Sequence, residues 1–325
     1  MSASDAFVST GHLAPSADVR RILLEIQHDL ADVTEGENSP VYPPLAAADP
    51  DQFGLCMVST TGEVFDVGDA YTGFAMMSVA KPFTFALVCA HLGAARAREE
   101  LGVNATGAAF NAVDPVVAAS GGRTNPMVNS GAIATCSRLP GADVEEQWAH
   151  LVAGLSAFAG RELALDEELY AQVSATNFRN REITAALQGQ GALACAPEDA
   201  LDLYSRQSSL DVSAHDLGVM GATLADGGTN PVTHAQVIEP ELCHHVLAVM
   251  ATAGMYEHSG DWLYDVGLPG KSGIGGGIVT VSPGKGGLGS FSPRLDAAGN
   301  SVRGVRAAAR LASELGLGLF MSRPE

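Results

Sequence analysis

Apolar residues first recur at helical spacing shortly after the amino terminus. Ser16 can cap the start of this helix. Its apolar face is formed by Ile22, Leu23, Ile26 and Leu30. Residues 1–16 are polar, and we expect them to form a flexible N-terminus. After the helix, residues 35–51 are rich in proline and acidic residues, which predicts a long irregular connection.

Strand patterns lie near the two ends of the chain. FGLCMVST (53–60) and EVFDVGD (63–69) are short apolar runs joined by a Thr-Gly pair, which predicts a hairpin. KSGIGGGIVTVSP (271–283) and GLGSFSP (287–293) have the same strand character. We expect a final helix after them, from about residue 301 to residue 317.

Helical patterns fill the middle of the chain. About residues 95–260, these patterns alternate with loops rich in Gly, Asn and Pro, and strand-like runs are few. SVAKPFTFALVCAHLG is typical of a buried helix that begins at Ser78 and ends at Gly93. Pro82 falls in its first turn, where a missing N–H is tolerated.

These patterns together predict an α+β fold. The N- and C-terminal segments would form one antiparallel sheet flanked by helices, with a helical subdomain in the middle. We treat residues 17–325 as one domain, with a sheet part at about 17–75 and 255–325 and a helical part at about 76–254. A cleft between the two layers is the expected ligand site.

The charge balance excludes some classes of partner. The chain has 325 residues, with 18 Lys and Arg against 37 Asp and Glu, a formal net charge of −19. A nucleic-acid surface needs clustered basic residues, and an anionic membrane repels an acidic protein, so we expect neither partner. We find no signal peptide and no apolar stretch of about 18 residues, which favours a cytoplasmic protein.

The cysteines do not indicate a metal site. They are Cys56, Cys89, Cys136, Cys195 and Cys243. They lie far apart without Cys-x-x-Cys or Cys/His ligand spacing, so we expect no structural zinc. Buried reduced thiols also fit a cytoplasmic location.

Ser78-Val79-Ala80-Lys81 is the first candidate for chemistry. Residues three apart share a helix face, so Lys81 can reach the Ser78 hydroxyl. A serine needs a base to become a nucleophile, and a lysine can be that base if burial lowers its pKa. The apolar residues around the motif would supply that burial. The structural alternative is a helix-capping serine beside an exposed lysine.

Lys271-Ser272-Gly273 lies in a glycine-rich strand near the other end of the chain. It is not a phosphate-binding loop, because Asp265 stands where the first glycine of that motif is required. A Lys-Ser/Thr-Gly strand is the third motif of serine acyl-enzymes that begin with Ser-x-x-Lys. In those enzymes the strand runs beside the nucleophile and helps to form the oxyanion hole. We expect the glycines at 275–277 to let the substrate approach the backbone.

The chain resembles the serine-dependent glutaminases, which have a β-lactamase-like fold, over about residues 40–305. The matching segments are PDQFGLCMVSTTGEVFDVGD, FAMMSVAKPF, NPMVNSGAIA, TNFRNREI, YSRQSSLDVSAHDLGVMGATLADGGTNPVT, GMYEHSGDWLYDVGLPGKSGIGGGIVTVSPGK and DAAGNSVRG. The resemblance implies a hydrolase that converts L-glutamine and water to L-glutamate and ammonia. It implies no metal and no organic cofactor.

The resemblance also implies roles for single residues. Ser78 would be the acylated nucleophile and Lys81 its base, while Tyr204 and Tyr256 would move a proton or stabilise the oxyanion. The residues expected to bind the substrate are Asn129, Asn180, Ile274 and Tyr42. Ile274 would act through its backbone N–H, and Tyr42 lies in a segment one residue shorter than the family's form.

Two positions depart from the family pattern. Met77 stands where the family has Gln before the nucleophile, and Val173 replaces the Glu that pairs with the substrate α-ammonium. Valine cannot accept a hydrogen bond, so glutamine would lose a partner for its charge. Gln172, Ser174 or the acidic pair at 167–168 could take over that role. Alternatively, the preferred amide could lack a free amino group, or activity could be lost.

Other readings stay open at the level of the sequence. A penicillin-recognising serine hydrolase shares the first and third motifs, and a catalytically silent binding protein could keep the fold. Residues 125–134 and 204–233 favour the glutaminase branch. We expect a small-molecule amide as the substrate, and the resemblance implies a homodimer or homotetramer.

Overall fold

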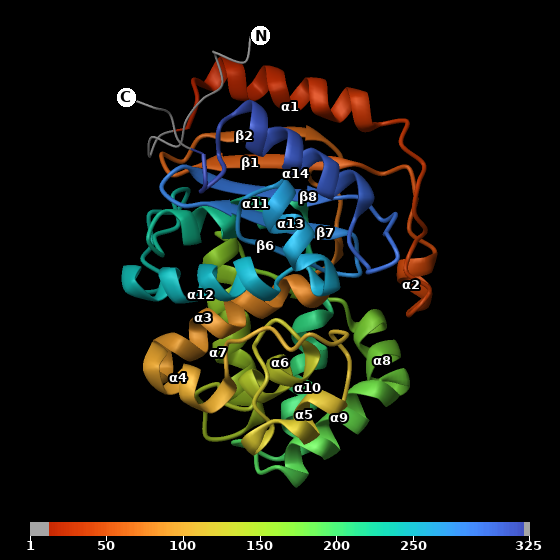
Figure 1. Cartoon of the computed structure of the whole chain (residues 1–325), viewed down its shortest axis with the longest axis vertical. Helices are drawn as coiled ribbons and strands as arrows, with labels where there is room; N and C mark the ends of the chain where they lie inside the picture. The colour runs from red at the N-terminus through yellow and green to blue at the C-terminus, as the bar shows by residue number, and fades with distance from the viewer. Residues whose placement is uncertain (1–12, 322–325) are drawn as a thin grey trace.

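A five-stranded antiparallel sheet forms one layer of the molecule (Figure 1). The computed structural model describes residues 13–321. In the order β2-β1-β8-β7-β6 the strands are Val64–Gly68, Gly54–Ser59, Gly286–Phe291, Gly277–Ser282 and Gly270–Ser272. The N-terminal hairpin therefore pairs directly with the C-terminal strands, and the predicted α+β fold is confirmed.

Helices cover both faces of this sheet. Helices α1 (Ser16–Leu30) and α14 (Val302–Glu314) contact each other on one face, and α11 (Ala214–Ala225) packs on the other. Side chains alternate accordingly along β1: Leu55 joins the core with α1 and α14, whereas its neighbour Cys56 faces α11. The alternation explains why every residue of this strand is buried.

A second layer, below the sheet in Figure 1, is mainly helical. Its longer helices are α3 (Lys81–Leu92), α4 (Ala94–Leu101), α6 (Asn129–Cys136), α7 (Val144–Ala159), α8 (Glu167–Thr176), α9 (Phe178–Gly189), α10 (Pro197–Ser208) and α12 (Pro240–Ala253). A shorter helix of this layer is α5 (Asp114–Ala118). Helix α13 (Ser259–Asp265) places Trp262 in the core with α1 and α14, and α2 (Pro43–Ala46) packs through Leu45 against α8. A small sheet joins β3 (Phe74–Ala75), β5 (Leu210–Val212) and β4 (Ala164–Leu165).

The structure differs from the sequence-based expectation in three places. The helix expected from Ser78 begins as a 3-10 turn, Met77–Ala80, and becomes α3 only at Lys81. Helix α11 lies within the range assigned to the helical part but packs on the large sheet, because its glycine-containing face fits closely against the strands. The small sheet was not expected, since two of its strands have only two residues.

The prediction of a flexible N-terminus over residues 1–16 lies mostly outside the described residues, which begin at Leu13. Helix α1 begins at Ser16. Within residues 13–321, no single helix is long and apolar enough to cross a membrane. The helical stretch Met77–Leu92 passes that test only together with α4, from which it is bent by 118°.

Candidate active site

Ser78 lies in the 3-10 turn between β3 and α3, and its side chain is buried. The preceding Met77 has a φ of 47°, an uncommon conformation for a residue with a side chain. The segment after β6 packs against this turn. A Cβ atom on Gly275 would lie 2.3 Å from the carbonyl oxygen of Ala75. The glycine therefore allows a close contact within the chain, and its expected role in substrate approach stays a prediction.

Lys81 is the first residue of α3 and is 1% exposed. Its Nζ donates a hydrogen bond to Oδ1 of Asn129 at 2.7 Å. Burial lowers the pKa of Lys81 to about 7, because an ammonium group loses its hydration in the interior. Among residues 13–321, no hydrogen bond joins Lys81 to Ser78. The lysine therefore has the basicity that the motif requires, while its contact in this structure is with an amide oxygen.

Two buried tyrosines face the nucleophile. Burial raises the pKa of Tyr204 and of Tyr256, and in both cases the Ser78 side chain acts in the opposite direction. The Tyr204 hydroxyl donates to Asn129 Oδ1 at 3.1 Å. The Tyr256 hydroxyl has no hydrogen-bond partner among the described residues. A buried phenol without a partner is available to a substrate or to the serine itself.

Lys271 lies in β6 and is completely buried. Burial lowers the pKa of Lys271 well below its usual value, and the charge of Lys81 adds to this effect. Its Nζ donates to the backbone oxygens of Gly254 and Ser272 at 2.9 and 2.6 Å and lies 4.3 Å from the ring centroid of Tyr256. The third motif thus places its lysine against the ring of one of the two tyrosines.

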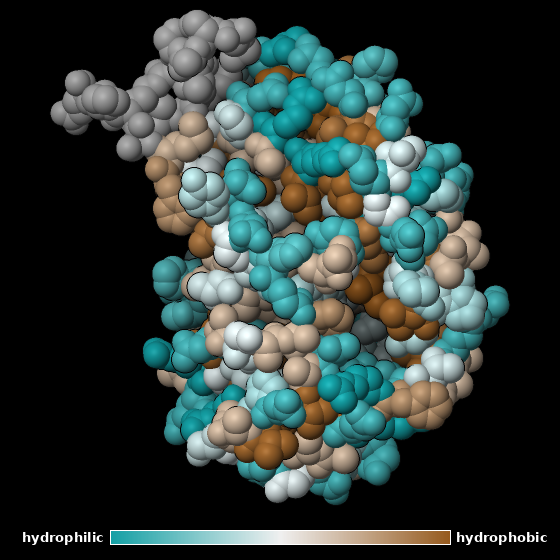
Figure 2. Space-filling view, turned by 45° about the vertical axis from the view of Figure 1, so that its right-hand side comes forward, coloured by the Kyte–Doolittle hydropathy of each residue, from teal (hydrophilic) through white to brown (hydrophobic). Residues whose placement is uncertain are grey.

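A cavity of about 170 Å³ contains Ser78. Apart from Lys81 and Tyr256, which are buried beside it, the predicted site residues all line this cavity: Tyr42, Ser78, Asn129, Val173, Asn180, Tyr204 and Ile274. Figure 2 brings this side of the molecule forward and shows a recess between the two layers, with hydrophobic residues along it. The tertiary fold therefore gathers residues that lie more than two hundred positions apart in the sequence.

One wall of the cavity is apolar. Val173, in α8, is 2% exposed and packs with Tyr42, Leu45, Met77 and Leu169. Among residues 13–321, no acidic residue lines the cavity, and Arg179 is the charged one that does. The possible substitutes at 167, 168, 172 and 174 do not line it, because a helix directs those neighbours to other faces.

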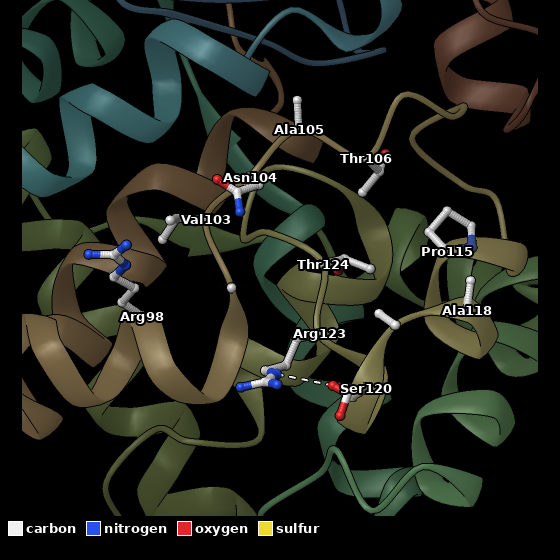
Figure 3. Close-up of a pocket in the computed structure, with 12 residues that line it drawn as sticks. Arg98, Val103, Asn104, Ala105, Thr106, Pro115, Ala118, Ser120, Arg123 and Thr124 are labelled. Carbon is white, nitrogen blue, oxygen red and sulfur yellow. Dashed lines mark hydrogen bonds between the residues drawn. The ribbon is translucent and has the colours of Figure 1, made fainter.

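Cavity size does not identify the site. A larger cavity of about 540 Å³ lies away from Ser78, beside α4 and α5 (Figure 3). It is lined by Arg98, Arg123 and small polar or apolar residues, and Arg123 donates to the Ser120 carbonyl at 3.0 Å. It contains none of the candidate catalytic residues.

A cluster with metal-ligand chemistry lies on the large sheet. The Cys56 thiol, the Asp66 carboxylate and the His215 imidazole lie within 4.8 Å of one another. Asp66 raises the pKa of His215, and burial raises the pKa of the Cys56 thiol. Both shifts favour protons over a metal ion, and the groups already contact one another. The cluster fits a hydrogen-bonded link between β1, β2 and α11.

The sequence analysis did not single out several residues that line the cavity, among them Phe110 and Asn177. Phe110 packs against the Tyr256 ring with centroids 4.5 Å apart, and no sequence signal marked it. Asn177 also lines the cavity and donates to and accepts from other buried polar groups. It stands inside the segment TNFRNREI, so that segment could have pointed to it.

Comparisons with known proteins show which family the chain is similar to. The family model named Glutaminase matches residues 36–320. Glutaminase 2 of Yersinia pestis is 58% identical over 318 residues, which cover 98% of this chain and 94% of the relative. The Glutaminase of Mycobacterium ulcerans is 43% identical, with 94% of this chain and 95% of the relative covered.

Solved structures show the same similarity. A structure titled "Probable glutaminase ybaS" superimposes with a TM-score of 0.94 at 36% identity, covering 95% of this chain and 100% of the other. Mglu in its native form superimposes with a TM-score of 0.89 at 37% identity, covering 94% and 74%. Mglu has also been solved in a glutamate form, with a TM-score of 0.89.

Proposed function

Because the chain belongs to the glutaminase family, we propose that it hydrolyses the side-chain amide of L-glutamine to L-glutamate and ammonia. The observation that carries the proposal is a buried lysine with a pKa lowered to about 7, three residues after a serine that lines a cavity. A serine beside a base of this kind is the arrangement used for acyl transfer. The enzyme is thus a serine-dependent amidohydrolase.

The reaction divides into two halves. Neutral Lys81 takes the Ser78 proton, and the serine oxygen attacks the amide carbon of the substrate. Backbone N–H groups of Ser78 and Ile274 hold the oxyanion, in keeping with the close packing of the two segments. Ammonia leaves with a proton relayed through Tyr204 or Tyr256, and water then hydrolyses the ester. Side chains and backbone supply every step, so no metal or organic cofactor is required.

Burial determines how much of Lys81 is neutral at pH 7 in this mechanism. At pH 7, an exposed lysine with a pKa near 10.4 would be neutral in fewer than about one molecule in a thousand. With a pKa of about 7, close to half of the Lys81 side chains are neutral at that pH. The apolar interior around α3 therefore supplies the base that the serine needs.

The test is covalent labelling combined with turnover. A glutamine analogue that carries a diazo-ketone should add one equivalent to the wild-type chain, at Ser78, in a mass spectrum. Ser78→Ala should lose the label and at least about a thousandfold of ammonia release from glutamine, because the acyl-enzyme cannot form. A wild-type chain that is neither labelled nor active would be the binding protein of our alternative reading.

The cavity wall bears on how well glutamine binds. The substrate α-ammonium would enter a cavity whose lining holds no acidic side chain. We infer weak recognition of that group, so amides without a charged amine should compete well with glutamine. Comparing glutamine with its des-amino and N-acyl analogues measures this preference. A kcat/KM for glutamine far above that for both analogues would contradict it.

The resemblance supports a proposal for assembly, while the acidic charge and the thiols support one for partners and location. We infer a homodimer or homotetramer in the cytoplasm, with no nucleic acid or membrane partner. Light scattering during size-exclusion chromatography measures the assembly, and a monomer at micromolar concentration would contradict it.

A further inference from the structure

A chain of three buried amides leads away from Lys81. Its members, which we call the amide chain, are Asn129, Asn180 and Asn177, and their side chains are 7%, 8% and 5% exposed. Asn129 Nδ2 donates to Asn180 Oδ1 at 2.9 Å, and Asn180 Nδ2 donates to Asn177 Oδ1 at 2.6 Å. These residues come from α6, from α9 and from the junction of α8 and α9. The amide chain thus connects separate helices along the lining of the cavity.

The far end of the amide chain is fixed by a backbone carbonyl. Asn177 Nδ2 donates to Ser205 Oγ at 3.3 Å, and the Ser205 hydroxyl donates to the carbonyl oxygen of Leu201 at 2.8 Å. A carbonyl oxygen can only accept, so the Ser205 hydroxyl uses its one proton there. Asn177 must then present its NH₂ to Ser205 and its oxygen to Asn180.

The orientation of Asn177 sets which atom of each following amide donates and which accepts, as far as Lys81. With its NH₂ directed at Asn180, Asn129 presents Oδ1 to Lys81 at 2.7 Å and to Tyr204 at 3.1 Å. An ammonium group has donors only, and a tyrosine hydroxyl donating to the same oxygen has used its proton. A flipped Asn129 would direct N–H groups at both of them.

We propose that Asn177 is a positioning residue that holds Asn129, through Asn180, with its oxygen toward Lys81. The proposal rests on the function assigned to Lys81 above. The oxygen stabilises the protonated lysine, so it opposes part of the effect of burial and sets the pH at which the base becomes available. The same oxygen also keeps the Tyr204 hydroxyl proton in a hydrogen bond until a bound substrate replaces that bond.

Three other titratable side chains among the described residues act on Lys81 or lie near it. The Cys136 thiol of α6 acts on the pKa of Lys81, and the Tyr204 ring lies 5.7 Å from its Nζ. Lys271 of β6 is close enough for Lys81 to lower its pKa. None of these groups belongs to the amide chain, so changing Asn177 leaves them in place.

Asn177→Ala tests the proposal through the pH profile of kcat/KM. Without Asn177, the Asn180 and Asn129 amides can flip, and an N–H group disfavours the lysine ammonium. We expect the apparent pKa of the rising limb to fall by about one pH unit, the size of a lost hydrogen bond to a charged group. The pH dependence of Ser78 labelling by the diazo-ketone analogue should shift equally.

Two variants separate positioning from general loss of packing. Asn177→Asp keeps an oxygen that accepts from Asn180. Its pH profile should therefore show the wild-type apparent pKa or a higher one. Thr184→Val removes a different buried hydrogen bond of α9. In it the Thr184 hydroxyl donates to the backbone carbonyl oxygen of Asn180 at 2.7 Å, so the side-chain amides are not involved. This variant should lower the unfolding temperature but leave the apparent pKa unchanged.

The outcomes distinguish this proposal from the proposed function. If wild type is active, Ser78→Ala is inactive and Asn177→Ala keeps the wild-type pKa, the amide chain has no positioning role. A shift shared by Thr184→Val would show that any disturbance of α9 moves the pKa and would also overturn it. Should Asn177→Ala fail to fold, Ser205→Ala removes the anchor instead and must shift the pKa in the same direction.

Discussion

The most consequential single residue is the lysine of the first motif. Its sequence position suggested a base, and burial lowers its pKa into the range that this proposed role requires. An exposed lysine at the same spacing would stay charged and would serve as a surface residue. The chemistry therefore depends on how thoroughly the helix that carries Lys81 is enclosed.

The titration of Lys81 gives a prediction for activity against pH. Because the pKa of Lys81 is lowered to about 7, kcat/KM for glutamine should rise about tenfold per pH unit below pH 6 and level off above pH 8. In Lys81→Ala, kcat/KM for glutamine should be at least about a thousandfold lower and should not rise with pH in this range. A flat profile between pH 5.5 and 8.5 in the wild type would contradict the role of this lysine.

Val173 gives a second prediction at this scale. Val173→Glu places a carboxylate on the apolar wall of the cavity and should lower KM for glutamine about tenfold or more, since a charged hydrogen bond contributes about 1.5–3 kcal/mol. The cost is about 1–3 kcal/mol of stability in the free protein, because the new charge is buried. Val173→Thr has nearly the same shape without charge and should leave KM unchanged. An unaltered KM in both variants would show that Val173 does not face the α-ammonium.

At the scale of elements, the cluster on the hairpin links α11 to the sheet. His215 Nδ1 lies 3.2 Å from Asp66 Oδ1, and Cys56 and Asp66 are directly opposite each other on β1 and β2. Asp66 raises the pKa of His215 in the folded protein. This contribution is complete below the unfolded pKa, about 6.5, and is lost as the pH rises through the folded value.

His215→Gln should therefore destabilise the protein more at pH 6 than at pH 9. We expect a difference of about 1 kcal/mol in the free energy of unfolding, discounted for the partial exposure of both side chains. Urea unfolding of both proteins at the two pH values measures it. Equal losses at pH 6 and pH 9 would mean that the imidazole acts by packing alone.

At the scale of the whole molecule, glycines decide how closely α11 approaches the sheet. A Cβ atom on Gly287 would lie 2.2 Å from the backbone nitrogen of Ala222 in α11, and one on Gly289 would lie 2.0 Å from the Ala214 carbonyl oxygen. Both collisions are with backbone, which cannot move aside without shifting the helix. This contact supports the sheet from which the third motif extends.

Gly287→Ala should consequently destabilise the protein by roughly 3 kcal/mol or more, as measured by urea unfolding. Gly260→Ala is the matched control, because nothing lies within 4 Å of the added Cβ atom. In a helix, that change should be neutral or stabilise by up to about 1 kcal/mol. Similar stabilities for the two variants would show that the helix and sheet can separate at little cost.

The sequence by itself indicated most of the elements and the candidate chemistry of this protein. The hairpin at 53–69, the strands after residue 270 and the motifs around Ser78 and Lys271 depend on local periodicity and residue type, which the sequence displays directly. The resemblance to glutaminases added the family, which the comparisons confirm. The roles assigned to Ser78, Lys81, Tyr204 and Tyr256 stay predictions for the experiments above.

Only the tertiary structure decided the environment of those residues. The burial of Lys81 and the direction of the amide chain from Leu201 to Asn129 depend on contacts between segments far apart in the sequence. So does the position of the Tyr256 hydroxyl, which has no hydrogen-bond partner within residues 13–321. The same holds for the placement of α11, which the sequence analysis grouped with the helical part. Local patterns record which face of an element is apolar, but they do not record which other element will cover it.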